Sequence, residues 1–152
     1  LVDPDNRIEP DWEQRRALVE TAARLDGPTS WEHDDVDASK AVVITRTLAL
    51  RQRRPAAFGG SAGYVPLEIS GIHADRALAF ARTTHDRPVV VTIAAIRAVG
   101  ARNWEATTIA LPEGTWRDRL ADDEQAIAGG ADVPLATWLD RFPVAVLERL
   151  DE

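Results

Sequence analysis

Residues 77–94 read ALAFARTTHDRPVVVTIA, which is two apolar runs separated by a polar turn. In the first run Leu78, Phe80 and Arg82 alternate with alanines, and this period of two is typical of a β-strand. The second run, Val89 to Ile93, is almost unbroken, as expected of a strand that is covered on both faces. The stretch therefore predicts two neighbouring strands inside a sheet.

Further short β-type runs lie on both sides of this pair. Strands are predicted over residues 64–69, 77–82, 88–94, 107–111, 115–120 and 144–150. Pro112 and Gly114 suit a turn between two of them. The strands do not alternate with helices as in a βαβ fold, so the sequence predicts an antiparallel sheet or sandwich over residues 62–152.

The first part of the chain is predicted to be helical, which makes the fold class α+β. Asp11 is suited to cap a helix that runs to Leu25 and ends before Pro28. A second helix is predicted to begin after Asp35 and to end before Pro55. The RQRR stretch near its C-terminal end is explained by the helix dipole and by solvation. We expect residues 1–58 to form a structural unit apart from the strands.

Composition excludes several classes of function. The formal charge of -7 over 152 residues argues against a nucleic-acid partner. The chain has no Cys, which excludes disulfides and thiolate chemistry and is consistent with a cytoplasmic protein. Its apolar runs are too short to cross a membrane.

Single residues give little sign of catalysis. His33, His73 and His85 have no metal-ligand spacing, so we expect surface or turn positions and no metal site. Serines occur outside any nucleophile-elbow pattern. The tryptophans offer two alternatives, a sugar-stacking platform or core packing. We favour packing for Trp116 and Trp138 and leave both alternatives open for Trp12.

The opening loop VDPDNR brings carboxylate, amide and guanidinium groups close together. Asp3, Asp5, Asn6 and Arg7 are the groups that proteins use to hold sugar hydroxyls. An equal alternative is that Arg7 pairs with Asp3 or Asp5 and makes the loop rigid. The two alternatives are compatible.

An ordered set of motifs resembles the C-terminal part of malto-oligosyltrehalose synthases, a family within the α-amylase superfamily of glycosidases. The set is VDPDNR, then Lys40 with ITRTLALRQRRPAAF, GGSAGYVPLEISG, ADRALAFAR, the W-x-x-T of Trp104 to Thr107, LPEGTWRDRL and PLATWLDRFPVAVLERL. The resemblance runs across essentially the whole chain. It implies that residues 1–58 are a loop and helices from the end of a catalytic (β/α)8 barrel, and that residues 62–152 are the C-terminal antiparallel β domain.

The resemblance also implies an activity. The family converts the reducing-end α-1,4 linkage of a maltodextrin into an α,α-1,1 trehalose linkage by intramolecular transglucosylation, without a cofactor. The catalytic carboxylates implied by the resemblance lie on barrel strands that precede Leu1, so the 152 residues alone are expected to be inactive. Asp3, Asp5, Asn6 and Arg7 are then expected at the rim of the sugar cleft, with maltooligosaccharide and the rest of the barrel as partners. The alternative is a non-catalytic carbohydrate-binding or structural β module.

Overall fold

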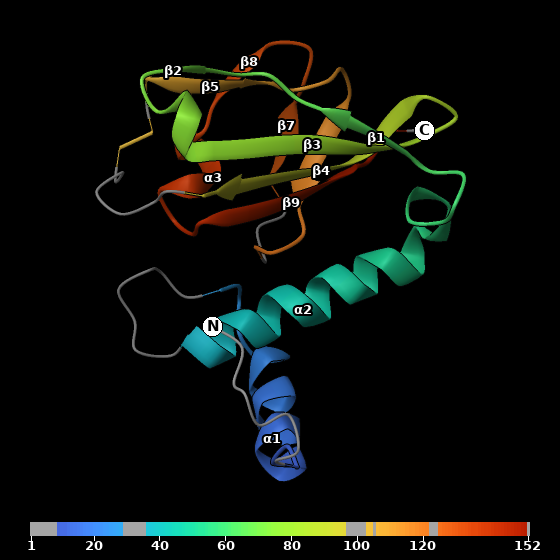
Figure 1. Ribbon diagram of the computed structural model, residues 1–152, viewed down its shortest axis with the longest axis vertical. Coiled ribbons are helices and arrows are strands. Elements are labelled where there is room, and N and C mark those ends of the chain that lie inside the picture. The colour runs from blue at the N-terminus through green and yellow to red at the C-terminus, as the bar shows by residue number, and fades with distance from the viewer. Residues whose placement is uncertain (1–8, 29–35, 97–102, 105, 122–124, 152) are drawn as a thin grey trace.

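A computed structural model describes residues 9–28, 36–96, 103–104, 106–121 and 125–151. It has three layers, which are a small sheet, a large sheet and a long helix (Figure 1). The fold is α+β with antiparallel strand pairing, as predicted.

Two helices come first. Helix α1 spans Trp12–Ala22, and Oδ1 of its cap residue Asp11 accepts a 2.9 Å hydrogen bond from the backbone N–H of Gln14. Helix α2 spans Val36–Arg53. Both agree with the prediction, because Asp11 caps one start and Pro55 opens a separate 3-10 turn, η1 (Pro55–Ala57), after the other.

The large sheet has the strand order β1-β3-β4-β9-β6-β7. Its strands are β1 (Gly63–Pro66), β3 (Ala77–Thr84), β4 (Arg87–Ala95), β6 (Thr115–Asp118), β7 (Ala126–Ala128) and β9 (Val144–Arg149). β3 and β4 form the hairpin that the alternating pattern predicts. His85 and Asp86 both have positive φ, at 50° and 63°, as a two-residue hairpin turn requires.

The small sheet has the order β2-β5-β8, formed by β2 (Ile69–Gly71), β5 (Thr107–Ala110) and β8 (Asp132–Pro134). The single strand predicted over residues 64–69 is wrong, because the chain changes sheets within it. The N–H of Leu67 donates to Ala79 of the large sheet, whereas the carbonyl of Glu68 accepts from Ala110 of the small sheet. Strands β7 and β8, the 3-10 turn η2 (Ala74–Arg76) and the short helix α3 (Ala136–Leu139) are absent from the sequence prediction.

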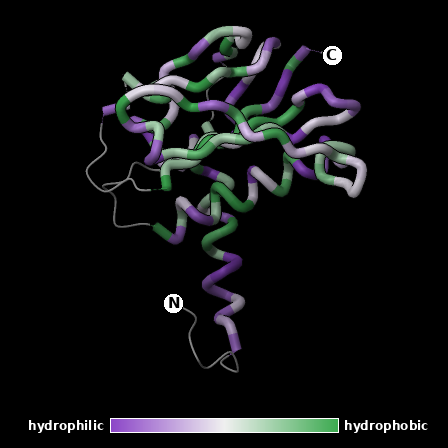
Figure 2. Tube along the Cα trace, turned by 45° about the horizontal axis from the view of Figure 1, so that its top comes forward, coloured by the Kyte–Doolittle hydropathy of each residue, from purple (hydrophilic) through white to green (hydrophobic). Residues whose placement is uncertain are grey.

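The main core lies between the two sheets. It contains the alanines of β3, Val91 and Ile93 of β4, Ile109 of β5 and three tryptophans. A second cluster joins α2 to the other face of the large sheet through Leu50, Val90 and Val146. The hydropathy colouring shows the same division, since the central strands are largely hydrophobic and α1 is mostly hydrophilic (Figure 2). Among the described helices, none is long and apolar enough to cross a membrane.

Candidate functional site

The four predicted sugar-contacting residues, Asp3, Asp5, Asn6 and Arg7, lie outside the described residues. The structure describes the helix that follows them. α1 is largely exposed, and Ala22 is its buried residue. The loop assignment therefore stays a prediction.

The tryptophans divide by burial. Trp104 and Trp116 are 0% exposed and Trp138 is 6% exposed, all within the inter-sheet core. The packing interpretation of Trp116 and Trp138 is confirmed, because a buried indole has no face free for a sugar ring. Trp12 is 61% exposed, and the guanidinium of Arg15 lies 5.8 Å from its ring centroid.

The described histidines occupy a turn and a packing position. His85 is in the β3–β4 hairpin turn, and the ring of His73 packs edge-on against Trp104 with centroids 5.9 Å apart. Within the part of the chain that the structure describes, no group of His, Asp or Glu side chains is arranged to hold a metal ion. The third histidine, His33, lies outside that part.

A cluster of arginines surrounds Glu148 on β9, whose side chain is 4% exposed. Its carboxylate accepts from Nε of Arg54 at 2.7 Å and Nε of Arg119 at 2.6 Å, and Nη2 of Arg53 lies 3.4 Å away. Burial raises the pKa of Glu148, but the hydrogen bond from Arg54 and the charges of Arg119 and Arg53 outweigh it, so the net pKa is lowered. A carboxylate held in this way joins α2 to the sheet.

The Glu148 cluster corrects the interpretation of the RQRR stretch. Arg53 and Arg54 pair with a carboxylate that lies about a hundred residues further along the chain, as well as lying near the helix end. The signal in the sequence was a single Glu inside the apolar run VAVLERL. A charge at an otherwise buried strand position requires an opposite charge, and Arg119 and Arg54 provide it.

A cavity of about 80 Å³ lies beside β6 and α3. Asp118, Trp138 and Arg141 contribute to its wall, together with Pro28, Leu120, Ala121, Gln125, Ile127, Thr137, Phe142 and Val144. Such a volume holds roughly two or three water molecules and is far below the roughly 300–1,000 Å³ of ligand pockets. The cavity is too small for a sugar.

Asp118 is the carboxylate in the wall of this cavity. Its Oδ1 accepts from the backbone N–H groups of Leu120 at 2.9 Å and Val146 at 3.2 Å. Burial raises the pKa of Asp118, and the two hydrogen bonds and the charges of Arg141 and Arg46 only partly offset that rise. Arg46 also donates to the carbonyls of Leu120 and Leu25, so these groups hold the connection after α1 against the sheet.

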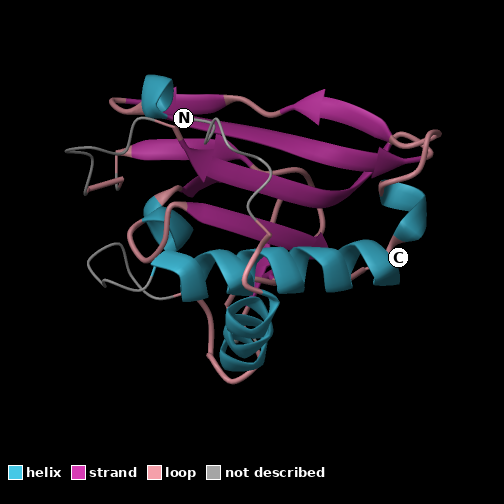
Figure 3. Ribbon diagram, turned by 60° about the horizontal axis from the view of Figure 1, so that its bottom comes forward, coloured by secondary structure: helices cyan, strands magenta, loops and turns pink. Residues whose placement is uncertain are grey.

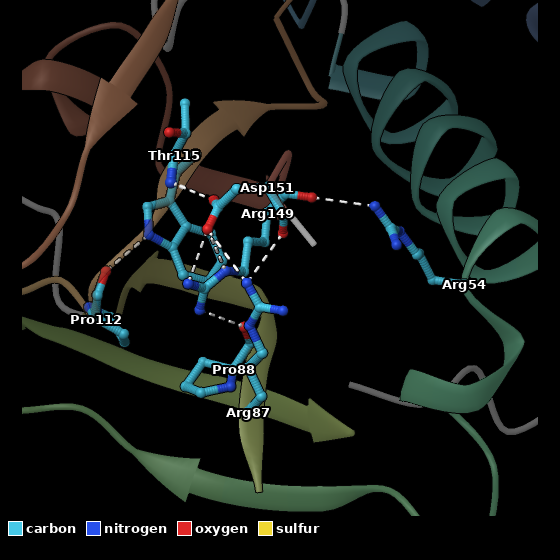
Figure 4. A network of polar contacts seen from close by, with 8 residues as sticks. Arg54, Arg87, Pro88, Pro112, Thr115, Arg149 and Asp151 are labelled. Atoms are coloured by element: carbon cyan, nitrogen blue, oxygen red, sulfur yellow. Dashed lines mark hydrogen bonds and ion pairs between the residues drawn. The ribbon is translucent and has the colours of Figure 1, made fainter. Parts of the chain in front are cut away.

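A second polar network fastens the C-terminal segment (Figure 4). The Asp151 carboxylate accepts from the N–H of Thr115 at 2.6 Å, from Nη2 of Arg149 at 2.9 Å and from Nη2 of Arg87 at 3.3 Å. The Thr115 hydrogen bond, followed by that from Arg149, lowers the pKa of Asp151 to about 2. The Arg149 guanidinium lies 5.8 Å from the centroid of the Trp116 ring. The backbone carbonyl of Arg149 accepts a hydrogen bond from Nη2 of Arg54. The contacts of Asp151 and Arg149 stabilise the fold.

Comparison with known proteins gives evidence about the family, which the geometry of the described residues does not give. No protein-family model matches the chain. Relatives from two strains of Mycobacterium tuberculosis, each named putative maltooligosyl trehalose synthase, are 32% identical to it over 149 residues. The alignment covers 98% of this chain and 17% of each relative.

The predicted resemblance to maltooligosyl trehalose synthases is confirmed. A solved structure, a mutant of maltooligosyltrehalose synthase from Arthrobacter ramosus, matches with a TM-score of 0.74 and 27% sequence identity. This match covers 99% of the present chain and 18% of that one. The chain therefore spans about a sixth of the length of the maltooligosyl trehalose synthases it matches.

The motifs that carry the resemblance fall mainly on core elements. ADRALAFAR forms η2 and β3, and LPEGTW contains the turn into β6. Trp104, Trp116 and Trp138 from three of the motifs pack in one cluster. The likeness to maltooligosyl trehalose synthases is thus a likeness of fold and packing in the described residues.

Proposed function

We propose that this chain is the C-terminal portion of an intramolecular transglucosylase that converts the reducing-end α-1,4 linkage of maltodextrins into an α,α-1,1 linkage. The observation that carries the proposal is the 32% identity to putative maltooligosyl trehalose synthases over 98% of the chain. The structural match to the Arthrobacter enzyme supports it independently of the curated relatives.

In this proposal residues 1–58 are the loop and helices that close a catalytic (β/α)8 barrel, and residues 62–152 are the β domain beside it. Asp3, Asp5, Asn6 and Arg7 form part of the rim of the sugar cleft, with Asp5 and Arg7 as the main groups that contact substrate or fix the loop. In (β/α)8 barrels the loops that follow the strands form the face where substrates bind, and this general rule is the reason for the proposed role.

The reacting carboxylates belong to the barrel strands outside these 152 residues. Superfamily relatives retain anomeric configuration, so one carboxylate attacks the sugar while a second donates and then accepts the proton. The proposed chemistry uses no cofactor, and we propose a cytoplasmic location, with which the absence of Cys is consistent. In this proposal the 152 residues help to bind the sugar and stabilise the barrel.

The first experiment is an assay of the longer protein encoded by the gene around this chain. Incubation with maltopentaose should give a product that ends in a non-reducing trehalose unit, which loss of reducing ends and the NMR signal of the α,α-1,1 linkage detect. The 152-residue chain assayed alone should give none. Product from the 152 residues alone, or none from the longer protein, would overturn the proposal.

The second experiment tests the loop. In the longer protein Arg7→Ala should lower turnover and leave the melting temperature nearly unchanged. Arg16→Ala is the matched control, because Arg16 lies on the exposed part of α1. A large fall in melting temperature with normal turnover would support a purely stabilising role for Arg7.

Among the described tryptophans, Trp12 is the candidate for the alternative of a carbohydrate-binding module, because Trp104, Trp116 and Trp138 are buried. Titrating the 152-residue chain with maltodextrin while following tryptophan fluorescence separates the two functions. Saturable quenching that Trp12→Phe abolishes would favour the module. A flat titration is expected if the chain acts only within the longer enzyme.

A further inference from the structure

One face of the large sheet is only partly covered by α2. Val90 of β4 and Val146 of β9 point to this face and pack against Leu50 of α2. Arg82 of β3 pairs with Val90 across the hairpin, so Arg82, Phe80 and Leu78 point to the same face. Viewed from the side of α2, the helix lies over the part of the sheet that contains β4 and β9, and it leaves other strands uncovered (Figure 3).

The part that α2 leaves uncovered carries a group of exposed apolar side chains. Tyr64 is 58% exposed, Leu78 40% and Ile96 52%, and the Tyr64 and Phe80 rings are stacked with centroids 4.8 Å apart. Ala95 pairs with Ala77, whose side chain points into the core, so Ala95 points inward as well. The next residue, Ile96, is therefore expected on the opposite face, with Leu78 and Phe80. We call Tyr64, Leu78, Phe80 and Ile96 the open sheet face.

The exposed side of α2 carries further apolar residues. Ile44 and Leu48 lie one helical turn apart and are 56% and 51% exposed. Exposed apolar groups of this kind on a folded chain indicate a contact with another protein surface.

The chemistry of the open sheet face suits a protein partner better than a sugar. A sugar site combines an aromatic ring with polar groups placed for its hydroxyls. Here Leu78 and Ile96 lie beside the aromatic pair, and Nε of the nearby Arg82 already donates to the carbonyl of Ala57. The open sheet face is therefore chemically complementary to an apolar protein surface.

The lengths of the relatives indicate which part of the protein would contact the open sheet face. The chain spans 17% of the Mycobacterium relatives and 18% of the Arthrobacter enzyme, so most of each relative has no counterpart here. We propose that the open sheet face, flanked by Ile44 and Leu48, is the docking surface for the catalytic part of the same, longer polypeptide. This inference rests on the proposed function and names the surface through which the β domain supports the barrel.

The test uses single cysteines, because the chain has none of its own. Leu78→Cys lies on the open sheet face, and Asp132→Cys is the matched control, because it is exposed on β8 of the small sheet, on the other side of the large sheet. Each is made in the 152-residue chain and in the longer protein. The rate of maleimide modification is followed by peptide mass spectrometry.

In the longer protein Leu78→Cys should react about tenfold or more slowly than in the 152-residue chain, because modification then requires local opening of the interface. Asp132→Cys should react at the same rate in both. If Leu78→Cys does not fold, covalent footprinting of Tyr64 in the unsubstituted proteins provides the same comparison.

Equal reactivity of Leu78→Cys in both contexts, in a longer protein that makes trehalose-capped product, would overturn the docking surface and leave the proposed function standing. Protection already present in the 152-residue chain, together with a doubled mass in solution, would assign the face to a second copy instead. Protection of Tyr64 by maltopentaose alone would assign it to sugar. Either of these results also overturns the proposal.

Discussion

Nε of Arg54, the residue after α2, donates a 2.7 Å hydrogen bond to the carboxylate of Glu148 in the interior of the large sheet. The same carboxylate accepts from Arg119, which follows β6. Three segments that are distant in sequence therefore meet at one buried charge. Helix α2 is attached to the β domain by this cluster as well as by the apolar contacts of Leu50.

Glu148→Gln should lower the free energy of unfolding of the chain at pH 7 by about 2 kcal/mol, because it removes charge-assisted hydrogen bonds to partly exposed arginines. Glu68→Gln, at an exposed position, should change it by less than about 0.5 kcal/mol. Urea unfolding of both variants measures the difference. Equal stability of Glu148→Gln and the unsubstituted chain would mean that the cluster does not stabilise the fold.

The pH dependence of Glu148 follows from its lowered pKa. A carboxyl with a folded-state pKa below its ordinary value of 4.5 stabilises the fold above that pH. The stabilisation is lost as the pH falls through the folded-state pKa. The difference in unfolding free energy between the unsubstituted chain and Glu148→Gln should therefore shrink on acidification below pH 4.5 and stay constant above it.

Asp118 should show the opposite sign, because burial raises its pKa. The contribution of Asp118 to the free energy of unfolding is fully present below its ordinary pKa of 3.8. This contribution is lost as the pH rises through the folded-state pKa. Asp118→Asn keeps an oxygen for the N–H groups of Leu120 and Val146 and carries no charge. Its stability relative to the unsubstituted chain should rise with pH over that window and then level off.

Asp118→Ala is the control for this prediction. It leaves the N–H groups of Leu120 and Val146 without their acceptor, which costs about 1–3 kcal/mol for each buried group. Denaturant unfolding between acid and neutral pH compares the variants. A flat difference between Asp118→Asn and the unsubstituted chain would contradict the raised pKa.

Gly129→Ala tests the close packing around Trp116. A Cβ at this position would overlap the carbonyl oxygen of Pro112, which also accepts the 2.8 Å hydrogen bond from Nε1 of Trp116. We expect a loss of about 1–3 kcal/mol in unfolding free energy from the forced rearrangement. Gly60→Ala, where a Cβ has nothing within 4 Å, should stay within about 0.5 kcal/mol.

Trp116→Ala and Trp12→Ala separate the buried from the exposed indoles. Removing the fully buried Trp116 should cost about 3–5 kcal/mol, because it leaves a cavity between the sheets. Removing Trp12, which is 61% exposed, should cost less than about 0.5 kcal/mol in the 152-residue chain. Thermal unfolding provides both values. Similar losses for the two variants would be inconsistent with their different burial.

Sequence reasoning succeeded where the signal is local. Asp11 caps α1 and Pro55 follows the end of α2, and both signals act within a few residues. It failed for β7 and β8, which are three residues long and carry too little of an alternating pattern to recognise. The break within residues 64–69 was also hidden, because it depends on which sheet Leu67 and Glu68 meet. Of the candidate site, the opening loop remains a prediction.

The sequence by itself determined that residues 77–82 alternate along a strand, but the tertiary structure decided which set faces inward. The alanines of β3 point into the inter-sheet core and the larger Leu78 and Phe80 point outward, because the small sheet packs closely against the alanine face. An alternating pattern specifies two faces without saying what will cover each. For the same reason Glu148 is an isolated charge in the sequence and a paired one in the fold, since Arg54 and Arg119 reach it only after the layers assemble.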